Sequence, residues 1–340
     1  MSTRQIICVV LLALAFAPKS NTQKRSPLKL LHTTPLPGFT GDFDHFGVDL
    51  KGKRLFLAAE DHKTVEVFDL QTGEREKSIT GFGEPHAILY LPESGNLLVT
   101  DGGEDFGRVE LVSGETYAIL KTITLHADVD GAVFNPVNKY YYVENGERSA
   151  ETHYLSVIDT RTFQHVGDMA LPGNHSEAMA IDRQGKKLYV NLSGTNEVGV
   201  IDLNTKQVTA RWPVPDAKVE NSMVLDEPNR RLFIATRNPP TFIVFDTDKG
   251  SVVTTLSCAA LNDDMWFDRD HRRIYASGTE TTTVIEQRDA NHYEHIAEVP
   301  TGYRAKTSIF VPQLHRLYVA VSGKGKPGAQ LAMQIYDVLP

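Results

Sequence analysis

Short apolar runs separated by polar turns recur along the whole chain. In each repeat, one run opens with an apolar residue directly after a polar one, as where Leu55 follows Arg54 and Leu232 follows Arg231. The equivalent opening residues lie 42, 43, 48, 44, 42 and 43 residues apart, and they are Leu55, Leu97, Tyr140, Leu188, Leu232, Ile274 and Leu317. A repeat of about 40–45 residues filled with strand patterns is typical of a propeller blade. The pattern therefore predicts an all-β, seven-bladed β-propeller.

The fourth repeat shows the predicted blade most clearly. Its four expected strands span residues 178–181, 188–191, 198–202 and 207–212. Each is rich in β-branched or aromatic residues, and a turn around Gly185 separates the first two. This composition favours strands over helices.

The last repeat has no segment for a fourth strand after the third, which we expect at residues 333–336. Leu28–Leu36 near the N-terminus resembles the fourth strands of other repeats, such as residues 119–125. We expect this segment to complete the last blade and close the ring, which removes an exposed sheet edge. The propeller domain is accordingly predicted to span residues 28–340.

The first 20 residues have the pattern of a signal peptide. Arg4 precedes an apolar run of 12 residues, Ile6–Ala17, which is too short to span a bilayer. A retained anchor or a buried strand is the alternative interpretation. The signal peptide predicts export, and therefore a periplasmic or extracellular location.

The charge balance excludes some partners. The net charge is −8 and the pI is about 5.8. Nucleic acids and anionic membrane surfaces would not attract such a chain, so neither is expected as a partner. We expect a monomer. The chain has no phosphate-binding loop, no dinucleotide fingerprint, and no G-x-S-x-G or H-E-x-x-H motif.

One position just before the first strand is polar in every repeat. In a propeller the first strand is innermost, so these residues should ring the mouth of the central channel. They are Asp44, His86, Asp130, Glu177, Asn221, Asp263 and Lys306. Carboxylates with an imidazole and an amide suit a divalent cation or a polyhydroxylated ligand. The alternative is that these side chains only satisfy exposed strand ends at a wet channel mouth.

Three repeats have a longer connection between their second and third strands, at residues 102–107, 145–153 and 322–330. These connections should lie on the same face as the polar ring. Loop growth on one face of a repeat protein often marks a binding surface, for a small polar ligand or for a protein partner. Neutral variation of surface loops is the alternative.

The fourth repeat also resembles a known sequence repeat. Residues 189–192 read Tyr-Val-Asn-Leu, and Val200, Ile201, Asp202 and Thr205 follow. This resembles the Y-V-T-N…V-I-D-x-x-T pattern of YVTN-repeat propellers, and the chain after residue 28 is similar to the secreted bacterial YncE-like group. The resemblance implies a seven-bladed propeller in the periplasm or outside the cell. Such proteins are often compared with lactonase propellers, but no lactonase catalytic motif matches here.

These observations favour a non-catalytic binding or scaffold propeller with a polar ligand site at the channel mouth. The alternative is a metal-dependent, lactonase-like hydrolase that acts on sugar lactones. Such an enzyme needs a base or a metal-bound water, and Glu177 and Asp263 are the side chains whose replacement would test it. The sequence identifies no catalytic residue and no certain cofactor, and a divalent cation is the one candidate.

Overall fold

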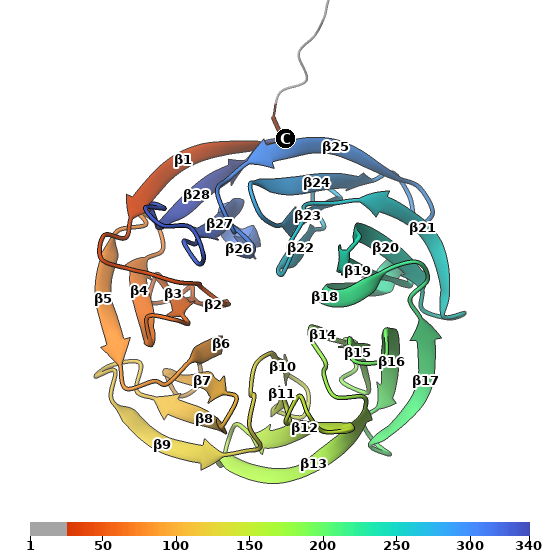
Figure 1. The fold of residues 1–340 in the computed structure, drawn as a ribbon, viewed down its shortest axis with the longest axis horizontal. Helices are drawn as coiled ribbons and strands as arrows, with labels where there is room; N and C mark the ends of the chain where they lie inside the picture. Colours follow the sequence, from red (N-terminus) through yellow and green to blue (C-terminus); the bar gives the residue numbers. More distant parts are fainter. Residues whose placement is uncertain (1–25) are drawn as a thin grey trace, which may run out of the picture.

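The computed structural model describes residues 26–340, so the predicted signal peptide lies outside the described residues. Seven antiparallel sheets of four strands each are arranged in a ring around a central opening (Figure 1). The sequence prediction of a seven-bladed propeller is confirmed.

The first strand of every blade lines the central channel (Figure 1). These inner strands are β2 (Phe46–Asp49), β6 (Pro85–Leu91), β10 (Ala132–Asn135), β14 (Met179–Ile181), β18 (Lys218–Asp226), β22 (Met265–Asp268) and β26 (Thr307–Val311). The second strands are β3 (Arg54–Ala59), β7 (Asn96–Gly103), β11 (Tyr140–Asn145), β15 (Lys187–Leu192), β19 (Arg231–Asn238), β23 (Arg273–Ser277) and β27 (Arg316–Val321).

The third strands are β4 (Thr64–Asp69), β8 (Phe106–Val112), β12 (Thr152–Asp159), β16 (Glu197–Asp202), β20 (Pro240–Asp246), β24 (Thr281–Gln287) and β28 (Ala332–Val338). The outer strands are β5 (Arg75–Thr80), β9 (Ile119–Thr124), β13 (Gln164–Pro172), β17 (Gln207–Pro213), β21 (Ser251–Ser257), β25 (Tyr293–Pro300) and β1 (Leu28–Pro35). Two single 3₁₀ turns, η1 (Glu227–Asn229) and η2 (Pro312–Leu314), connect first and second strands within the described part of the chain.

The N-terminal strand closes the ring as predicted. β1 pairs antiparallel with β28, with Leu28 opposite Val338 and Pro35 opposite Ala332. Leu28 is buried in an apolar cluster with Tyr336, whereas Leu31 on the same strand is 40% exposed. β1 is an outer strand and is mostly exposed, Leu30 included at 48%, so Leu28 is its main buried contact with the last blade.

The core lies between adjacent blades. Six of the seven repeat anchors are fully buried, and Tyr140 is the exception. The apolar clusters span neighbouring sheets: Phe56 of the first blade packs in one cluster with Ile88 and Leu97 of the second. Each blade thus buries its apolar face against the next, which is why the repeat is stable only as a ring.

The three long connections differ in form. Residues 102–107 belong mostly to an extended hairpin, because Gly102 pairs with Gly107 and Gly103 with Phe106. The segment between β11 and β12 is a loop over residues 146–151, and the one between β27 and β28 is a loop over residues 322–331. Glycines mark turns in most contexts, so the sequence alone gave no reason to extend the hairpin through them.

Candidate functional site

Backbone register places four of the predicted ring residues at one repeat position. Each lies two residues before an inner strand, and each backbone N–H donates to a carbonyl oxygen of the second strand in its own blade. These bonds are Asp44 to Ala58, Asp130 to Glu144, Glu177 to Asn191 and Asp263 to Ser277. His86 and Asn221 lie within β6 and β18, at irregularities in the pairing, and Lys306 directly precedes β26.

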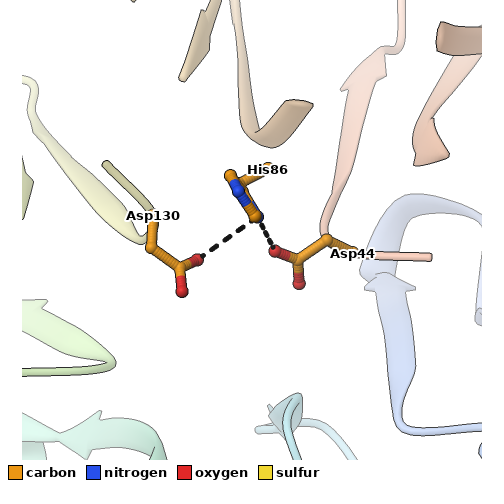
Figure 2. Close-up of side chains that lie close together, drawn as sticks. All are labelled: Asp44, His86 and Asp130. Atoms are coloured by element: carbon orange, nitrogen blue, oxygen red, sulfur yellow. Dashed lines mark hydrogen bonds and ion pairs between the residues drawn. The ribbon is translucent and has the colours of Figure 1, made fainter. Parts of the chain in front are cut away.

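His86 joins the first three blades at the channel mouth. Its Nδ1 lies 2.7 Å from Oδ2 of Asp44 and 3.7 Å from Oδ1 of Asp130 (Figure 2). Its Nε2 lies 3.0 Å from the carbonyl oxygen of Gly102, in the extended hairpin of the second blade. The ring and this connection therefore share one face of the propeller.

These contacts fix the charge of His86. A carbonyl oxygen only accepts hydrogen bonds, so Nε2 donates to Gly102, and the ionised carboxylate of Asp44 takes the other ring proton. Burial lowers the pKa of His86, but Asp130 and Asp44 outweigh it and raise the pKa to about 10. His86 is an imidazolium held between two carboxylates and has no free nitrogen for a metal ion.

Lys306 compensates the carboxylates on the other side of Asp44. Its Nζ forms a short ion pair with Asp263 and lies 3.8 Å from Oδ1 of Asp44. Arg237 donates to the second oxygen of Asp263 at 2.7 Å. Burial would raise the pKa of Asp44, but His45, Lys306 and His86 hold it well below its usual range.

Two further charged side chains belong to this network, and the sequence analysis did not single them out. His45 donates from Nδ1 to Asp264 at 3.0 Å, which links the first blade to the sixth. Glu60, at the end of β3, has its pKa raised to about 7 by burial and by the carboxylate of Asp44. His45 directly follows the ring residue Asp44, whereas Glu60 follows β3 and lies outside the positions that the repeat alignment identified.

The channel behind the ring holds a cavity of about 480 Å³. Glu177, Asn221 and Asp263 line it together with inner-strand residues such as Trp266. Asn221 is 3% exposed, and its side-chain oxygen has no hydrogen-bond partner. A buried, unsatisfied amide oxygen beside a cavity is a free acceptor for a ligand or a water molecule.

A second group of acidic side chains lies between the third and fourth blades. Single oxygens of Asp130, Glu144 and Glu177 lie within 4.8 Å of one another. Glu144 is 1% exposed and accepts hydrogen bonds from the Ser176 hydroxyl and, at 3.1 Å, from the Gly131 N–H. Burial raises the pKa of Glu144 well above its ordinary value, and the Asp130 and Glu177 carboxylates add to the shift.

Two histidines flank this acidic group. His175 Nε2 lies 2.7 Å from Oε1 of Glu177. His153 is 1% exposed, neither of its ring nitrogens has a hydrogen-bond partner, and its Nε2 lies 3.9 Å from Oε2 of Glu144. Burial and the neighbouring His175 lower the pKa of His153 to about 4, so its imidazole is neutral near pH 7.

The repeat alignment contains a signal that would have identified Glu144. When the alignment is extended from the ring positions into the second strand, it reaches one residue in each blade. The backbone N–H or carbonyl group of that residue bonds to the inner strand. Small or polar neutral side chains occupy the other six equivalents, which are Ala58, Thr100, Asn191, Ala235, Ser277 and Ala320. All six are buried, so a glutamate at this position is an anomaly.

The structure therefore divides the predicted ring. Asp44, His86, Asp130, Asp263 and Lys306 form one chain of ion pairs. Glu177 bonds to His175 and approaches Asp130 and Glu144 instead. Asn221 stands apart: its residue lines the cavity, and its buried side-chain oxygen has no hydrogen-bond partner.

Comparison with known proteins shows the fold only. A scan against protein-family profiles gave no match. The chain is 23% identical over 214 residues to the uncharacterized protein YwhL of Bacillus subtilis, in a match that covers 57% of this chain and 41% of that protein. The chain thus spans less than half of that relative's length, and the predicted YVTN-repeat family stays a prediction.

Solved structures with a similar fold include unrelated assemblies. A chain in the crystal structure of the mitotic checkpoint complex superposes with a TM-score of 0.74 at 14% identity, covering 99% of both chains. A chain of Kuenenia stuttgartiensis hydrazine synthase gives a TM-score of 0.70 at 16% identity, covering 90% of this chain and 96% of the other. These likenesses establish the propeller fold.

Across residues 26–340, no helix is long and apolar enough to cross a membrane.

Proposed function

We propose that this protein is an exported propeller that binds a small polyhydroxylated ligand at its channel mouth. The observation that carries the proposal is the side chain of Asn221, which lines a cavity of about 480 Å³ and whose buried oxygen has no hydrogen-bond partner. Glu177 and Asp263 line the same cavity and add carboxylate oxygens that accept hydrogen bonds from hydroxyl groups. A cavity of this volume is within the usual range for small-molecule sites.

The charged side chains at the channel mouth favour some classes of ligand over others. The ring holds four carboxylates against the cations of His86 and Lys306, and both cations are already paired with Asp44, Asp130 or Asp263. Arg237 also pairs with Asp263, so no positive group of the ring is left to hold an anionic ligand. Neutral sugars, sugar alcohols and amino sugars fit this environment better than sugar acids.

The proposal that the protein is exported rests on the signal-peptide pattern of residues 1–20. Cell fractionation tests it: the mature protein should appear in the periplasm or the medium, whereas full-length protein in the cytoplasm would overturn it. Size-exclusion chromatography of the same preparation tests the expected monomer.

Titration calorimetry with neutral monosaccharides, sugar alcohols, amino sugars, sugar acids and sugar lactones tests the binding proposal. We expect at least one neutral or amino sugar to bind. Asn221→Ala should weaken that binding without unfolding the protein, because the Asn221 oxygen has no partner to lose. Binding that is unchanged in Asn221→Ala and in Glu177→Gln would contradict the proposed site.

A lactonase-like hydrolase is the second candidate. The observation in its favour is the convergence of Asp130, Glu144 and Glu177, whose oxygens could hold a cation that polarises a lactone carbonyl. The lactones of the same panel test it: turnover by the wild-type protein that is lost in Glu177→Gln supports an enzyme. Binding of lactones without turnover would reject this candidate and leave the binding function in place.

A further inference from the structure

Glu144 departs from the repeat in a way that needs a physical cause. The equivalent side chain is neutral in every other blade, and the position is buried throughout. Removing an ionised carboxylate from water costs several kcal/mol unless an opposite charge or good hydrogen bonds compensate. Ser176 and the Gly131 N–H supply two hydrogen bonds, but neither brings a positive charge.

The neighbouring carboxylates increase the free-energy cost of burying an ionised Glu144. Asp130 and Glu177 place further carboxylate oxygens within 4.8 Å of its own. The hydrogen bonds of the nearby cations go to other groups: Arg148 donates to Asp128 at 2.6 Å, and His86 donates to Asp44 and Gly102 while lying 3.7 Å from Asp130. Asp130 therefore shares His86 with Asp44, Glu177 bonds to His175, and Glu144 has no cation of its own.

His153 is a second and independent indication of a ligand. It is 1% exposed, both ring nitrogens lack a hydrogen-bond partner, and Nε2 is directed toward Glu144. Nδ1 lies against Gly146, where any larger side chain would come within 2.8 Å of it. A buried imidazole that has no hydrogen-bond partner and lies 3.9 Å from a buried carboxylate is in the arrangement expected of two ligands awaiting a shared ion.

We propose that Glu144, Glu177, Asp130 and His153 bind a divalent transition-metal ion between the third and fourth blades. Ligand atoms about 2.0–2.2 Å from a shared ion lie roughly 3–4 Å apart. The three carboxylates need only small adjustments to reach this spacing, and His153, 3.9 Å from Glu144, would have to move toward the same ion. Carboxylates combined with an imidazole favour Zn²⁺, Mn²⁺ or Co²⁺, whereas Ca²⁺ and Mg²⁺ prefer oxygen ligands alone.

Neighbouring hydrogen bonds would orient the ligands, as they do in established metal sites. Ser176 and Gly131 fix the carboxylate of Glu144, and His175 holds Glu177. The neighbouring group around His86 lacks this capacity because both of its ring nitrogens are occupied.

The proposed metal site can be tested separately from the proposed sugar site. Glu177 also lines the channel cavity, so the ion would lie beside the organic ligand, but Glu144 and His153 do not line it. Substitutions of those two residues test the metal without removing a cavity side chain. A failed metal site would leave the binding function untouched.

The test uses purified protein treated with a chelator and then titrated with Co²⁺, followed by visible absorption. Calorimetry with Zn²⁺, Mn²⁺, Ca²⁺ and Mg²⁺ runs in parallel. We expect one Co²⁺ per chain, with affinity about 100-fold lower in Glu144→Gln and His153→Gln, given that even outer-shell changes cost about 10- to 100-fold. Ser176→Ala should lower the affinity about tenfold, and Zn²⁺ should raise the Tm of the wild-type protein only.

His126→Gln is the matched control. His126 lies on the same face, stacks on Tyr154 and is half exposed, so its loss should leave Co²⁺ affinity unchanged. Circular dichroism of each variant establishes that it folds, and the conservative Gln replacements keep side-chain volume. No Co²⁺ or Zn²⁺ binding at about 1 mM, or equal affinity in Glu144→Gln and wild type, would overturn the proposal. Ca²⁺ binding that is insensitive to His153→Gln would overturn it as well.

Discussion

His86 Nδ1 donates a hydrogen bond of 2.7 Å to Asp44 Oδ2, and this contact ties the inner end of the second blade to that of the first. Asp44 is 5% exposed and His86 is 8% exposed. Asp44 and His86 are therefore buried and paired with each other. Replacing them affects folding as well as binding.

We predict that His86→Ala lowers the free energy of unfolding by about 3 kcal/mol, because it leaves a buried carboxylate without its partner. Adding Asp44→Asn should cost less than the sum of the two single changes, with a coupling of about 1–3 kcal/mol. Urea unfolding of the wild type, both single variants and the double variant measures it. Additive effects would show that the contact does not stabilise the ring.

Closure of the propeller depends on one buried residue of β1. Leu28 is 3% exposed and packs with Tyr336, whereas Leu31 is 40% exposed. We predict that Leu28→Ala costs about 2–3 kcal/mol because it opens a cavity in the last blade. Leu31→Ala, on the same strand, should change stability by less than about 0.5 kcal/mol. Thermal unfolding distinguishes them, and similar losses in both variants would contradict closure through this packing.

Glu220 makes stability depend on pH. It is fully buried in β18, and neither carboxylate oxygen has a hydrogen-bond partner. Burial raises its pKa to about 7, and the facing carboxylates of Glu177 and Glu197 add to the shift. Between the unfolded pKa of 4.5 and the folded pKa of about 7, the folded state keeps a proton that the unfolded state has lost. Stability from this group is therefore present below pH 4.5 and lost as pH rises to 7.

The expected contribution is on the order of 2–3 kcal/mol. Glu220→Gln should remove it, so the variant should gain stability relative to wild type at pH 8 and show little difference at pH 4.5. Urea unfolding at both pH values measures the free energy of unfolding of each protein. Because the other titrating groups are the same in both proteins, their effects cancel when the two free energies are subtracted. A variant that is less stable than wild type at pH 8 would show that the charged form of Glu220 is stabilised by the fold.

The sequence predicted the propeller because its evidence is local and repeated. An apolar residue such as Leu55 or Leu232 recurs at a near-constant spacing, and six of the seven copies are fully buried. The N-terminal closure followed from one missing strand and one unassigned segment. The constant register before the inner strands also identified residues such as Asp44 and Asp263, which the backbone places at equivalent positions.

The partners of these residues could not be predicted, because they come from neighbouring blades and from connections. His86 reaches Asp44 in one blade and approaches Asp130 in another, and these contacts settle its charge. His153 lies just after the loop over residues 146–151, where the repeat spacing breaks down. The repeat alignment includes Glu144. However, a carboxylate at this position is recognised as unusual only once the structure shows that the equivalent residues of the other blades are buried.

The central claim is that the channel mouth of this propeller is a ligand site. A crystal structure of the protein with the tightest-binding sugar of the panel tests it most directly. We predict density in the cavity of about 480 Å³, with a ligand hydroxyl within hydrogen-bond distance of the Asn221 side-chain oxygen. Ligand density on the opposite face, among the turns between first and second strands, would contradict the claim and leave the ring as a network of ion pairs that only stabilises the fold.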